Sequence, residues 1–449
     1  MVLQERAFRR GRCVRSSRRV KVTFWVASIC MLGVGLSCPS GTTERPSQLP
    51  RQDDDLVVFF TGSELGSLRP CGCSGGQLGG IEKRSAVFNT VPVSRRLVVE
   101  TGSLVPSDRE QDLMKFRILF EAFGQLRYDV VHLTDRDLET AARLGLLADP
   151  KPSFPVLRAG QKGPAAVFTR RVTAGGRDIT VHIIASDDLS DIPDHPDGAA
   201  VNIVILNKAL SGLPGKMPGV HCIICPSTSD EPQVLSTSGD VPLVFTVGRF
   251  ARHIGRLNVT FGKQADRPVL HFESIPVQAK LPDDPALVRL YRQYQQLVSQ
   301  SSLLESYPRT PLPGRLSFAG SAACQPCHGS EYEQWNSTGH ARAFAALKKV
   351  GSDRDPECVI CHVAGLEYEG GFVNEEKTPQ LAGVGCENCH GPASEHVLTA
   401  GQTPPGQPKT ACTKCHTPEQ SGGFAGHEEE YMKKIMHRRE PATLGNVKE

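Results

Sequence analysis

The sequence predicts two folded parts, a layered α/β domain over residues 55–280 and a mainly α domain with little regular sheet over residues 316–440. Two observations lead to this prediction. Short apolar runs alternate with mixed segments in the first part, which is typical of strands buried in an α/β core. Beyond Phe318 such runs disappear, and Gly, Pro and short helical pieces dominate. A length of 449 residues agrees with this division, because it suggests two or three domains.

The N-terminus has the composition of an export signal. Residues 1–21 carry eight basic side chains and one acid, and residues 22–37 carry no charge. A basic segment followed by a short apolar run is typical of a secretory signal. Without residues 1–37 the formal net charge changes from +3 to −4, which argues against a nucleic-acid surface. We therefore predict an exported protein, periplasmic or membrane-anchored facing the periplasm, with no nucleic-acid partner.

Cys38 follows this signal. Gly35-Leu36-Ser37-Cys38 resembles the sequence before a lipid-modified cysteine, a motif that prefers leucine where Gly35 stands. Two alternatives stay open: residues 1–38 are a lipoprotein signal that leaves Cys38 lipidated, or they are a simple cleaved signal. Residues 39–54 are polar and Pro-rich and predict a tether.

The first domain is predicted to contain buried strands and a helix. The strands are expected at residues 56–60, 97–99, 130–133, 201–206, 220–224 and 243–247, and the helix at residues 116–126. Residues 281–315 then predict a helical linker, in which Asp283-Asp284-Pro285 opens an amphipathic helix. Its apolar face is expected to hold Leu287, Leu290, Tyr291, Tyr294, Leu297 and Val298.

The pattern Cys-x-x-Cys-His occurs four times in the last third of the chain. Its members are Cys324, Cys327 and His328; Cys358, Cys361 and His362; Cys386, Cys389 and His390; and Cys412, Cys415 and His416. Two thiols at this spacing can each form a thioether to a haem vinyl group, and the following histidine is held beneath the iron. Zinc ribbons also repeat Cys-x-x-Cys, but they require no histidine after every pair. We therefore predict four covalent haem c groups in a haem-packed, multihaem cytochrome domain.

Each haem iron has a sixth coordination position. The segment holds four further histidines, His340, His396, His427 and His437, which allow four bis-histidine haems without requiring them. A second histidine gives an electron-transfer haem, whereas an open position can bind a small ligand. For His427, which lies in a polar segment, solvent exposure is the preferred interpretation.

Residues 316–438 resemble the tetrahaem cytochromes of the cytochrome c-554 type. The likeness covers all four motifs and their flanks, including Trp335, Gly370-Gly371-Phe372 and Gly391-Pro392. The resemblance implies that the distal iron ligands are His340, His396 and His437. It also implies that the haem on Cys358 and Cys361 has an open or weakly filled sixth site, and it predicts no ligand at His427. The count of histidines leaves His427 open as the alternative ligand.

Residues 56–261 resemble the metallophosphatase domain of the 5′-nucleotidase family, by the order of strands and by Gly79-Gly80-Ile81 with Lys83-Arg84. That family needs two metals bridged by Asp, His and Asn. The expected ligand positions hold other residues, at 61–65, 100–103, 134–138, 206–208 and 222–225. Glu64, Asp135 and Asp137 are the residues that could rebuild a site. We predict that phosphatase activity is absent, because every histidine ligand is lost.

Two cysteine pairs accompany these losses. Cys71 and Cys73 follow the first predicted strand, and Cys222 and Cys225 replace a ligand turn. Four thiols at one edge of a sheet could bind zinc or an iron–sulfur cluster. A disulfide within or between the pairs is the alternative in an oxidising compartment. Spacing alone does not decide between them.

Together these features predict an electron-transfer protein rather than an enzyme. The cytochrome domain would pass electrons to a redox partner protein, and the first domain would serve as a scaffold or docking module. One alternative is a haem oxidoreductase that acts on a small nitrogen or sulfur species at a five-coordinate iron. The other is a metallophosphatase fused to a cytochrome.

Overall fold

The computed structural model describes residues 56–70, 76–159, 165–174, 177–192, 200–237, 241–261, 267–418 and 420–437. The predicted signal, Cys38, the tether and the Cys71–Cys73 pair lie outside these residues. Within the described ranges, no helix has both the length and the apolar character needed to cross a lipid bilayer.

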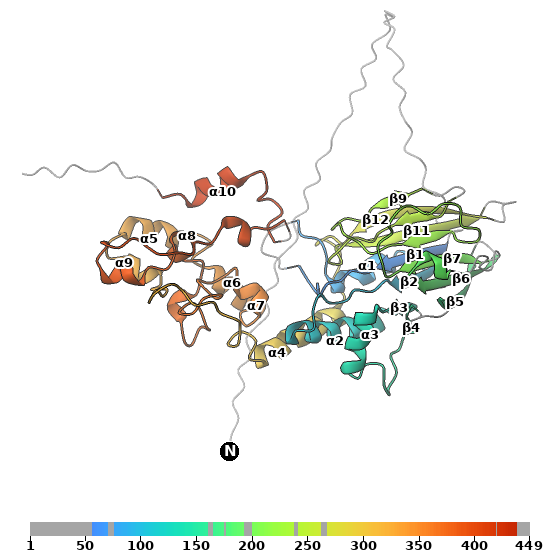
Figure 1. The fold of residues 1–449 in the computed structure, drawn as a ribbon, viewed down its shortest axis with the longest axis horizontal. Helices are drawn as coiled ribbons and strands as arrows, with labels where there is room; N and C mark the ends of the chain where they lie inside the picture. Colours follow the sequence, from blue (N-terminus) through green and yellow to red (C-terminus); the bar gives the residue numbers. More distant parts are fainter. Residues whose placement is uncertain are drawn as a thin grey trace, which may run out of the picture. The chain divides into compact units, whose positions relative to one another are not determined.

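The first sheet has six strands in the order β12-β11-β1-β2-β3-β4 (Figure 1). Their bounds are β1 Leu56–Thr61, β2 Arg96–Glu100, β3 Val130–His132, β4 Val156–Leu157, β11 His253–Phe261 and β12 Pro268–Pro276. Strands β1 to β4 run parallel, whereas β11 pairs antiparallel with both β1 and β12. The carboxyl ends of β1, β2 and β3 therefore meet at one edge of this sheet.

The second sheet also has six strands, in the order β5-β6-β7-β8-β10-β9. Their bounds are β5 Ala166–Ala174, β6 Arg177–Ser186, β7 Val201–Leu206, β8 Cys222–Ile224, β9 Val234–Ser236 and β10 Leu243–Phe245. Strands β6, β7, β8 and β10 are parallel, and the outer strands β5 and β9 are antiparallel to their neighbours.

Strand β1 shows why its apolar run is continuous. Leu56, Val58 and Phe60 belong to a core shared with the second sheet, while Val57 and Phe59 face a core shared with helices. Successive side chains of a strand point to opposite faces, so a strand buried on both faces carries no polar alternation. The first domain is therefore a layered α/β domain with a sheet-on-sheet core, as predicted.

Helices cover the outer face of the first sheet (Figure 1). Those of the first domain are α1 Arg84–Phe88, α2 Glu110–Gln125, α3 Asp135–Arg143 and α4 Pro285–Gln300, with 3-10 turns at Ile81–Lys83, Val93–Arg95 and Leu189–Asp191. The Asp284 side chain caps α4 by accepting from the backbone N–H of Ala286, and Pro285 occupies the first turn.

Helix α4 is part of the first domain rather than a free linker. Its buried residues Leu287, Leu290, Tyr294 and Val298 pack into the same core as α2. The expected apolar face is wrong at Leu297, whose side chain is 41% exposed. Leu297 lies on the side of the helix that points away from this core.

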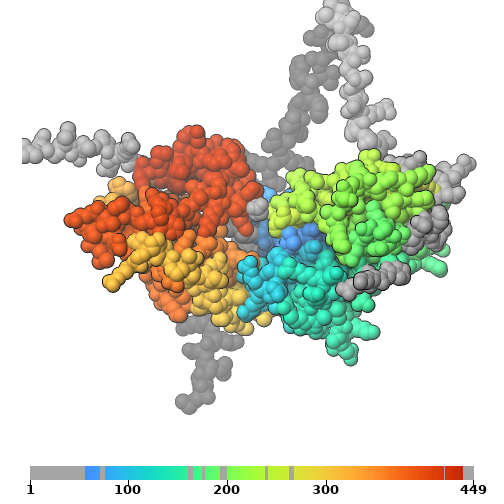
Figure 2. All heavy atoms as spheres, viewed as in Figure 1, coloured from blue at the N-terminus to red at the C-terminus, as the bar shows by residue number. Residues whose placement is uncertain are grey.

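The second part has short helices and, among its described residues, no strand beyond isolated bridges. The helices are α5 Gly329–Asn336, α6 Ala343–Val350, α7 Pro356–Val359, α8 Cys386–His390, α9 Ser394–Leu398 and α10 Glu428–Ile435, with 3-10 turns at Ser321–Cys324, Pro379–Leu381 and Cys412–Lys414. The mainly α character predicted for this part is confirmed. Figure 2 shows the heavy atoms of both parts as spheres.

The second part also contains a small apolar core of its own, around the second motif. Its buried members are Leu304, Leu312, Phe318, Phe344, Leu347, Val359, Val363, Ala364, Leu366, Phe372 and Leu381. The cluster ends at residue 381, so the third and fourth motifs lie where large buried apolar side chains are scarce.

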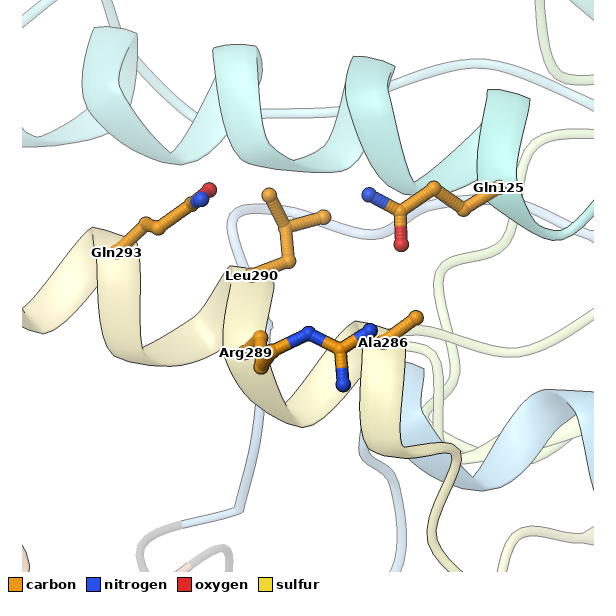
Figure 3. Close-up of a pocket in the computed structure, with 5 residues that line it drawn as sticks. All are labelled: Gln125, Ala286, Arg289, Leu290 and Gln293. Carbon is orange, nitrogen blue, oxygen red and sulfur yellow. The ribbon is translucent and has the colours of Figure 1, made fainter.

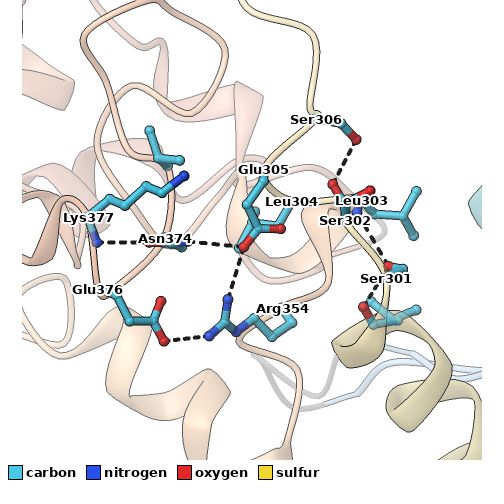
Figure 4. Close-up of polar contacts among 12 residues, drawn as sticks. Ser301, Ser302, Leu303, Leu304, Glu305, Ser306, Arg354, Asn374, Glu376 and Lys377 are labelled. Carbon is cyan, nitrogen blue, oxygen red and sulfur yellow. Dashed lines mark hydrogen bonds and ion pairs between the residues drawn. The ribbon is translucent and has the colours of Figure 1, made fainter.

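Polar contacts tie the segment after α4 to this cluster (Figure 4). The Arg354 guanidinium pairs with Glu305 at 3.1 Å and also with Glu376. The Asn374 side chain donates to the same Glu305 carboxylate at 3.0 Å. These contacts fix the chain on both sides of the second Cys-x-x-Cys-His motif.

Candidate functional site

Three pairs of histidine rings face each other in the second part. The ring centroids are 6.2 Å apart for His328 and His396, 6.0 Å for His390 and His437, and 6.2 Å for His416 and His340. Each pair joins the histidine of one motif to a histidine outside the motifs. Two metal–nitrogen bonds of about 2 Å, plus roughly 1 Å from each nitrogen to its ring centre, separate two axial imidazoles by about 6 Å. The rings are thus spaced to hold one iron between them.

Backbone carbonyls orient two imidazoles, one from these pairs and one from the second motif. The Nδ1 atom of His396 lies 2.8 Å from the Thr403 carbonyl oxygen, and that of His362 lies 2.7 Å from the Ala343 carbonyl oxygen. A carbonyl oxygen can only accept, so Nδ1 must donate its hydrogen. Nε2 then keeps the lone pair that binds a metal, an arrangement common among metal-ligating histidines.

Each motif forms a tight helical turn. The His328 N–H donates to the Cys324 carbonyl at 2.9 Å, and the His416 N–H donates to the Cys412 carbonyl at 2.9 Å. Cys386–His390 is itself helix α8. Residues four apart on a helical turn lie on one face, so the first cysteine and the histidine of a motif point the same way. This arrangement suits a motif whose cysteines attach one haem edge while its histidine lies on the same side.

Thiols from different motifs lie close together. The Cys324 thiol interacts with that of Cys386, and the Cys361 thiol interacts with that of Cys415. Cys389 and Cys412 also lie close enough to influence each other. Every motif therefore has at least one sulfur near a sulfur of another motif.

His427 lies apart from the three ring pairs. Its side chain is 57% exposed, and its Nδ1 atom is 3.5 Å from the Glu430 carboxylate. It immediately precedes α10 in a run of acidic residues. This position agrees with the solvent exposure expected from its polar segment.

A small pocket lies where the parallel strands of both sheets end. Its lining consists of Ser63, Thr101, Ser103, Thr134, Ile205, Leu206, Asn207, Ile224, Cys225 and Pro226. Hydroxyl, amide and thiol groups are its polar members, and the described residues that line it include no carboxylate or imidazole. These are the strand ends at which the resemblance to metallophosphatases places the metal ligands.

The three acids that could have rebuilt a metal site do not converge. Asp137 caps α3 and accepts from the backbone N–H groups of Ser103 and Leu104. Asp135 is exposed, and Glu64 is fully buried in an ion pair with Arg84. Throughout the described ranges, no group of three or more His, Cys, Asp or Glu side chains could hold a metal ion. These three acids therefore do not form a metal site among the described residues.

A buried polar cluster lies beneath β1 and β2. The Arg84 guanidinium pairs with Glu64 and donates to the Tyr128 hydroxyl at 3.1 Å. Thr61 donates to the Glu100 carboxylate and lies 2.8 Å from the Tyr128 hydroxyl. Burial, and secondly repulsion by Glu64, raise the pKa of Glu100 well above its ordinary value. One cation thus serves two buried carboxyl groups.

Cys222 and Cys225 do not face one another. Cys222 packs with Ile224 in the core between the sheets, whereas Cys225 packs with Ile223 on the opposite face of β8. Side chains three apart along an extended strand point to opposite faces. Burial raises the pKa of Cys225 to about 11, so its thiol stays protonated at neutral pH. The four-thiol site stays a prediction, because Cys71 and Cys73 lie outside the described residues.

A groove between α2 and α4 offers a further hollow (Figure 3). Gln125 of α2 and Ala286, Arg289, Leu290 and Gln293 of α4 line it. It combines one exposed cation with two amides and apolar surface. Nothing in this set supplies a nucleophile or an acid–base pair.

Comparison with known proteins supports the resemblance of the second part. Residues 323–391 match the sequence model of the family described as "Cytochrome c554 and c-prime". Cytochrome c-554 of Nitrosomonas europaea is 39% identical over 90 residues, a match that covers 17% of this chain and 38% of that protein. The chain thus spans less than two fifths of this relative. The resemblance to c-type cytochromes, which carry covalently bound haem c, is confirmed for this segment.

Solved structures similar to this chain include a calcineurin-like phosphoesterase, YfkN, from Bacillus subtilis, with 10% identity and a TM-score of 0.40 over 54% of this chain and 97% of that one. A 5′-nucleotidase precursor from Thermus thermophilus has 15% identity and a TM-score of 0.38 over 66% and 68%. A putative 5′-nucleotidase from Staphylococcus aureus has 13% identity and a TM-score of 0.40 over 74% and 70%.

Proposed function

We propose that this chain is an exported multihaem c-type cytochrome that transfers electrons through four covalently bound haems. The observation that carries the proposal is the set of three facing imidazole pairs, each spaced for one iron and each including a motif histidine. His396, His437 and His340 would be the second imidazole ligands of the irons held by His328, His390 and His416, respectively. Two imidazole ligands make an iron suited to electron transfer rather than to substrate binding.

The contacts between thiols support one order of the haems. The first motif meets the third through Cys324 and Cys386, and the second meets the fourth through Cys361 and Cys415. Cys389 and Cys412 lie near each other and connect the third with the fourth. Because each sulfur would carry one edge of a haem, the proposed order is first, third, fourth, second.

The protein's own groups hold and tune these haems. When bound, haem c supplies a reversible one-electron couple. The cysteine thiols would attach haem c, and the motif histidines would bind its iron. The Thr403 and Ala343 carbonyls hold His396 and His362 in the tautomer whose Nε2 can bind iron. The small apolar cluster around the second motif excludes water there.

The first domain is proposed to act as a scaffold without catalysis of its own. Its pocket at the strand ends offers hydroxyl, amide and thiol groups in place of acids and imidazoles. Those groups cannot hold the two metals that activate water in metallophosphatases. Export would place the chain in the periplasm, held by a lipid on Cys38 or released, where a redox partner protein receives the electrons.

Haem stoichiometry tests this function. The exported protein should carry four haems per chain by pyridine haemochrome and protein assay, and chemical reductants and oxidants should cycle all of them. Replacing both cysteines of one motif, as in Cys386→Ala with Cys389→Ala, should remove one haem only. A wild-type chain with fewer than four haems contradicts the proposal, and so does phosphate release from a panel of nucleotides and phosphoesters.

The position of His427 favours a second candidate function, binding of a small nitrogen or sulfur species at the second haem. The three ring pairs use the other three histidines, while His427 is exposed and directed at Glu430. Carbon monoxide added to the reduced protein should then bind one haem in four. Absence of any carbon monoxide spectrum rules out this candidate and leaves the electron-transfer function intact.

A further inference from the structure

The segment that carries Cys358 is held by the first domain. Asp355 caps helix α7 by accepting from the backbone N–H of Glu357 at 3.0 Å. The same carboxylate accepts from the Gln111 side chain of α2 at 2.8 Å and from the Tyr294 hydroxyl of α4 at 2.9 Å. The Asp355 carboxylate is largely buried and accepts hydrogen bonds from three donors, and these contacts hold it in one position.

A second contact places a charge beside this anchor. Lys115 follows Gln111 by one turn on the same face of α2, and its ammonium group lies 2.6 Å from both carboxylate oxygens of Glu357. Glu357 directly precedes Cys358. The Lys115 side chain is 8% exposed, whereas that of Glu357 is 57% exposed. The ammonium group is therefore poorly screened by water.

The backbone of the first domain makes room for this lysine. Gly66 has a φ of +77°, and a Cβ atom there would lie 3.1 Å from the Lys115 Cδ atom. The lysine stem thus runs against the loop that follows β1. This packing restricts the position of the ammonium group, whereas a lysine on the surface is not restricted in this way.

We propose that helix α2 sets the redox potential of the haem attached to Cys358 and Cys361, through the buried ammonium group of Lys115 and its ion pair with Glu357. The inference rests on the proposed haem attachment at this motif. Oxidation adds one positive charge to a haem, so a nearby cation disfavours the oxidised form and raises the potential. A nearby carboxylate has the opposite effect. Buried charges act more strongly than exposed ones, because the effective dielectric around them is lower.

Two single substitutions test the sign of this effect. Lys115→Met keeps the length and packing of the side chain but leaves Glu357 uncompensated, so the potential of this haem should fall. Glu357→Gln leaves Lys115 uncompensated, so the potential should rise. The double variant removes both charges and should return the potential toward the wild-type value. Lys115 and Glu357 are positioning residues, and a purely structural role would not shift the potential in opposite directions.

The measurement is a redox titration of the full-length holoprotein, followed by its optical spectrum. The wave of this haem is identified as the one absent from the Cys358→Ala/Cys361→Ala protein. Lys348→Met is the matched control, because Lys348 pairs with Glu375 at 2.8 Å but the two side chains are 48% and 43% exposed. It should leave all four waves in place, since exposed pairs are strongly screened.

Opposite shifts confined to this one wave support the inference. Unchanged potentials in both single variants, with haem content and thermal unfolding preserved, overturn it, and so do equal shifts of all four waves. A wild-type titration that lacks a wave for this motif would instead contradict the proposed haem attachment. The two failures are therefore distinguishable.

Discussion

Arg84 supplies the positive charge of the buried cluster beneath β1 and β2, and it pairs directly with Glu64. Removing one partner of a buried pair leaves the other charged group without compensation. Arg84→Met should therefore lower the free energy of unfolding by about 3–5 kcal/mol. Chemical denaturation of the holoprotein measures this loss. The double variant Glu64→Gln/Arg84→Met should lose less, and a stable Arg84→Met protein would show that the pair contributes little.

Glu100 gives this cluster a pH dependence. Burial and Glu64 raise its pKa in the folded protein well above the ordinary value of 4.5. Its contribution to stability is complete below the unfolded-state pKa and is lost as the pH rises toward the folded-state pKa. Glu100→Gln removes that loss. The free energy of unfolding of the variant, relative to wild type, should therefore increase as the pH rises from about 4.5. A difference independent of pH would contradict the raised pKa.

The role of each distal histidine can be tested separately through the spin state of one haem. His396→Ala removes the ring opposite His328, so one low-spin haem should become high-spin in the oxidised protein. His427→Ala is the control, because the exposed His427 faces Glu430. It should leave the spin states unchanged. A low-spin spectrum retained in His396→Ala would exclude this residue as a ligand.

The sequence allowed the residues of the haem motifs to be predicted, and the resemblance named the distal histidines, but neither showed which motif each distal histidine meets. The spacing of Cys and His within a motif is local, so the attachment residues can be recognised without a fold. The pairing of His340 with the fourth motif and of His437 with the third depends on how distant segments meet. The cluster of Glu64, Arg84 and Glu100 was not predicted for the same reason, because its members come from three separate segments of the chain.

At the scale of elements, strands buried on both faces were predictable and edge strands were not. The continuous apolar runs predicted β1, β2, β3, β7, β8 and β10. The β5–β6 hairpin and β12 carry Arg, Thr, His and Glu on exposed faces, so no apolar run marks them. Antiparallel edge strands with one solvent-exposed face lack the continuous apolar run that predicts a buried strand.

Helix α4 offers a test of its packing. Leu290 is buried in the core shared with α2, whereas Leu297 on the same helix is 41% exposed. Leu290→Ala should lower the free energy of unfolding by about 2–5 kcal/mol, because it removes buried methyl groups and leaves a cavity. Leu297→Ala should change it by less than about 0.5 kcal/mol. Equal losses in the two variants would mean that α4 does not pack on this face.

At the scale of the whole molecule, chain segments from two parts of the sequence meet at the second motif. Helices α2 and α4 supply Gln111, Lys115 and Tyr294 to the turn that precedes Cys358. The proposed haem order ends at this motif, so the first domain contacts one terminus of the electron path. A scaffold role therefore has a structural basis in the contacts of a single short segment.

Electron paramagnetic resonance of the oxidised holoprotein tests directly whether three irons are each held by two histidines, because it distinguishes haems by spin state. We expect four haems per chain, three of them low-spin with two imidazole ligands each. His340→Ala, His396→Ala and His437→Ala should each convert one different low-spin signal to high-spin. Three low-spin signals that survive all three substitutions would contradict the proposed iron ligands.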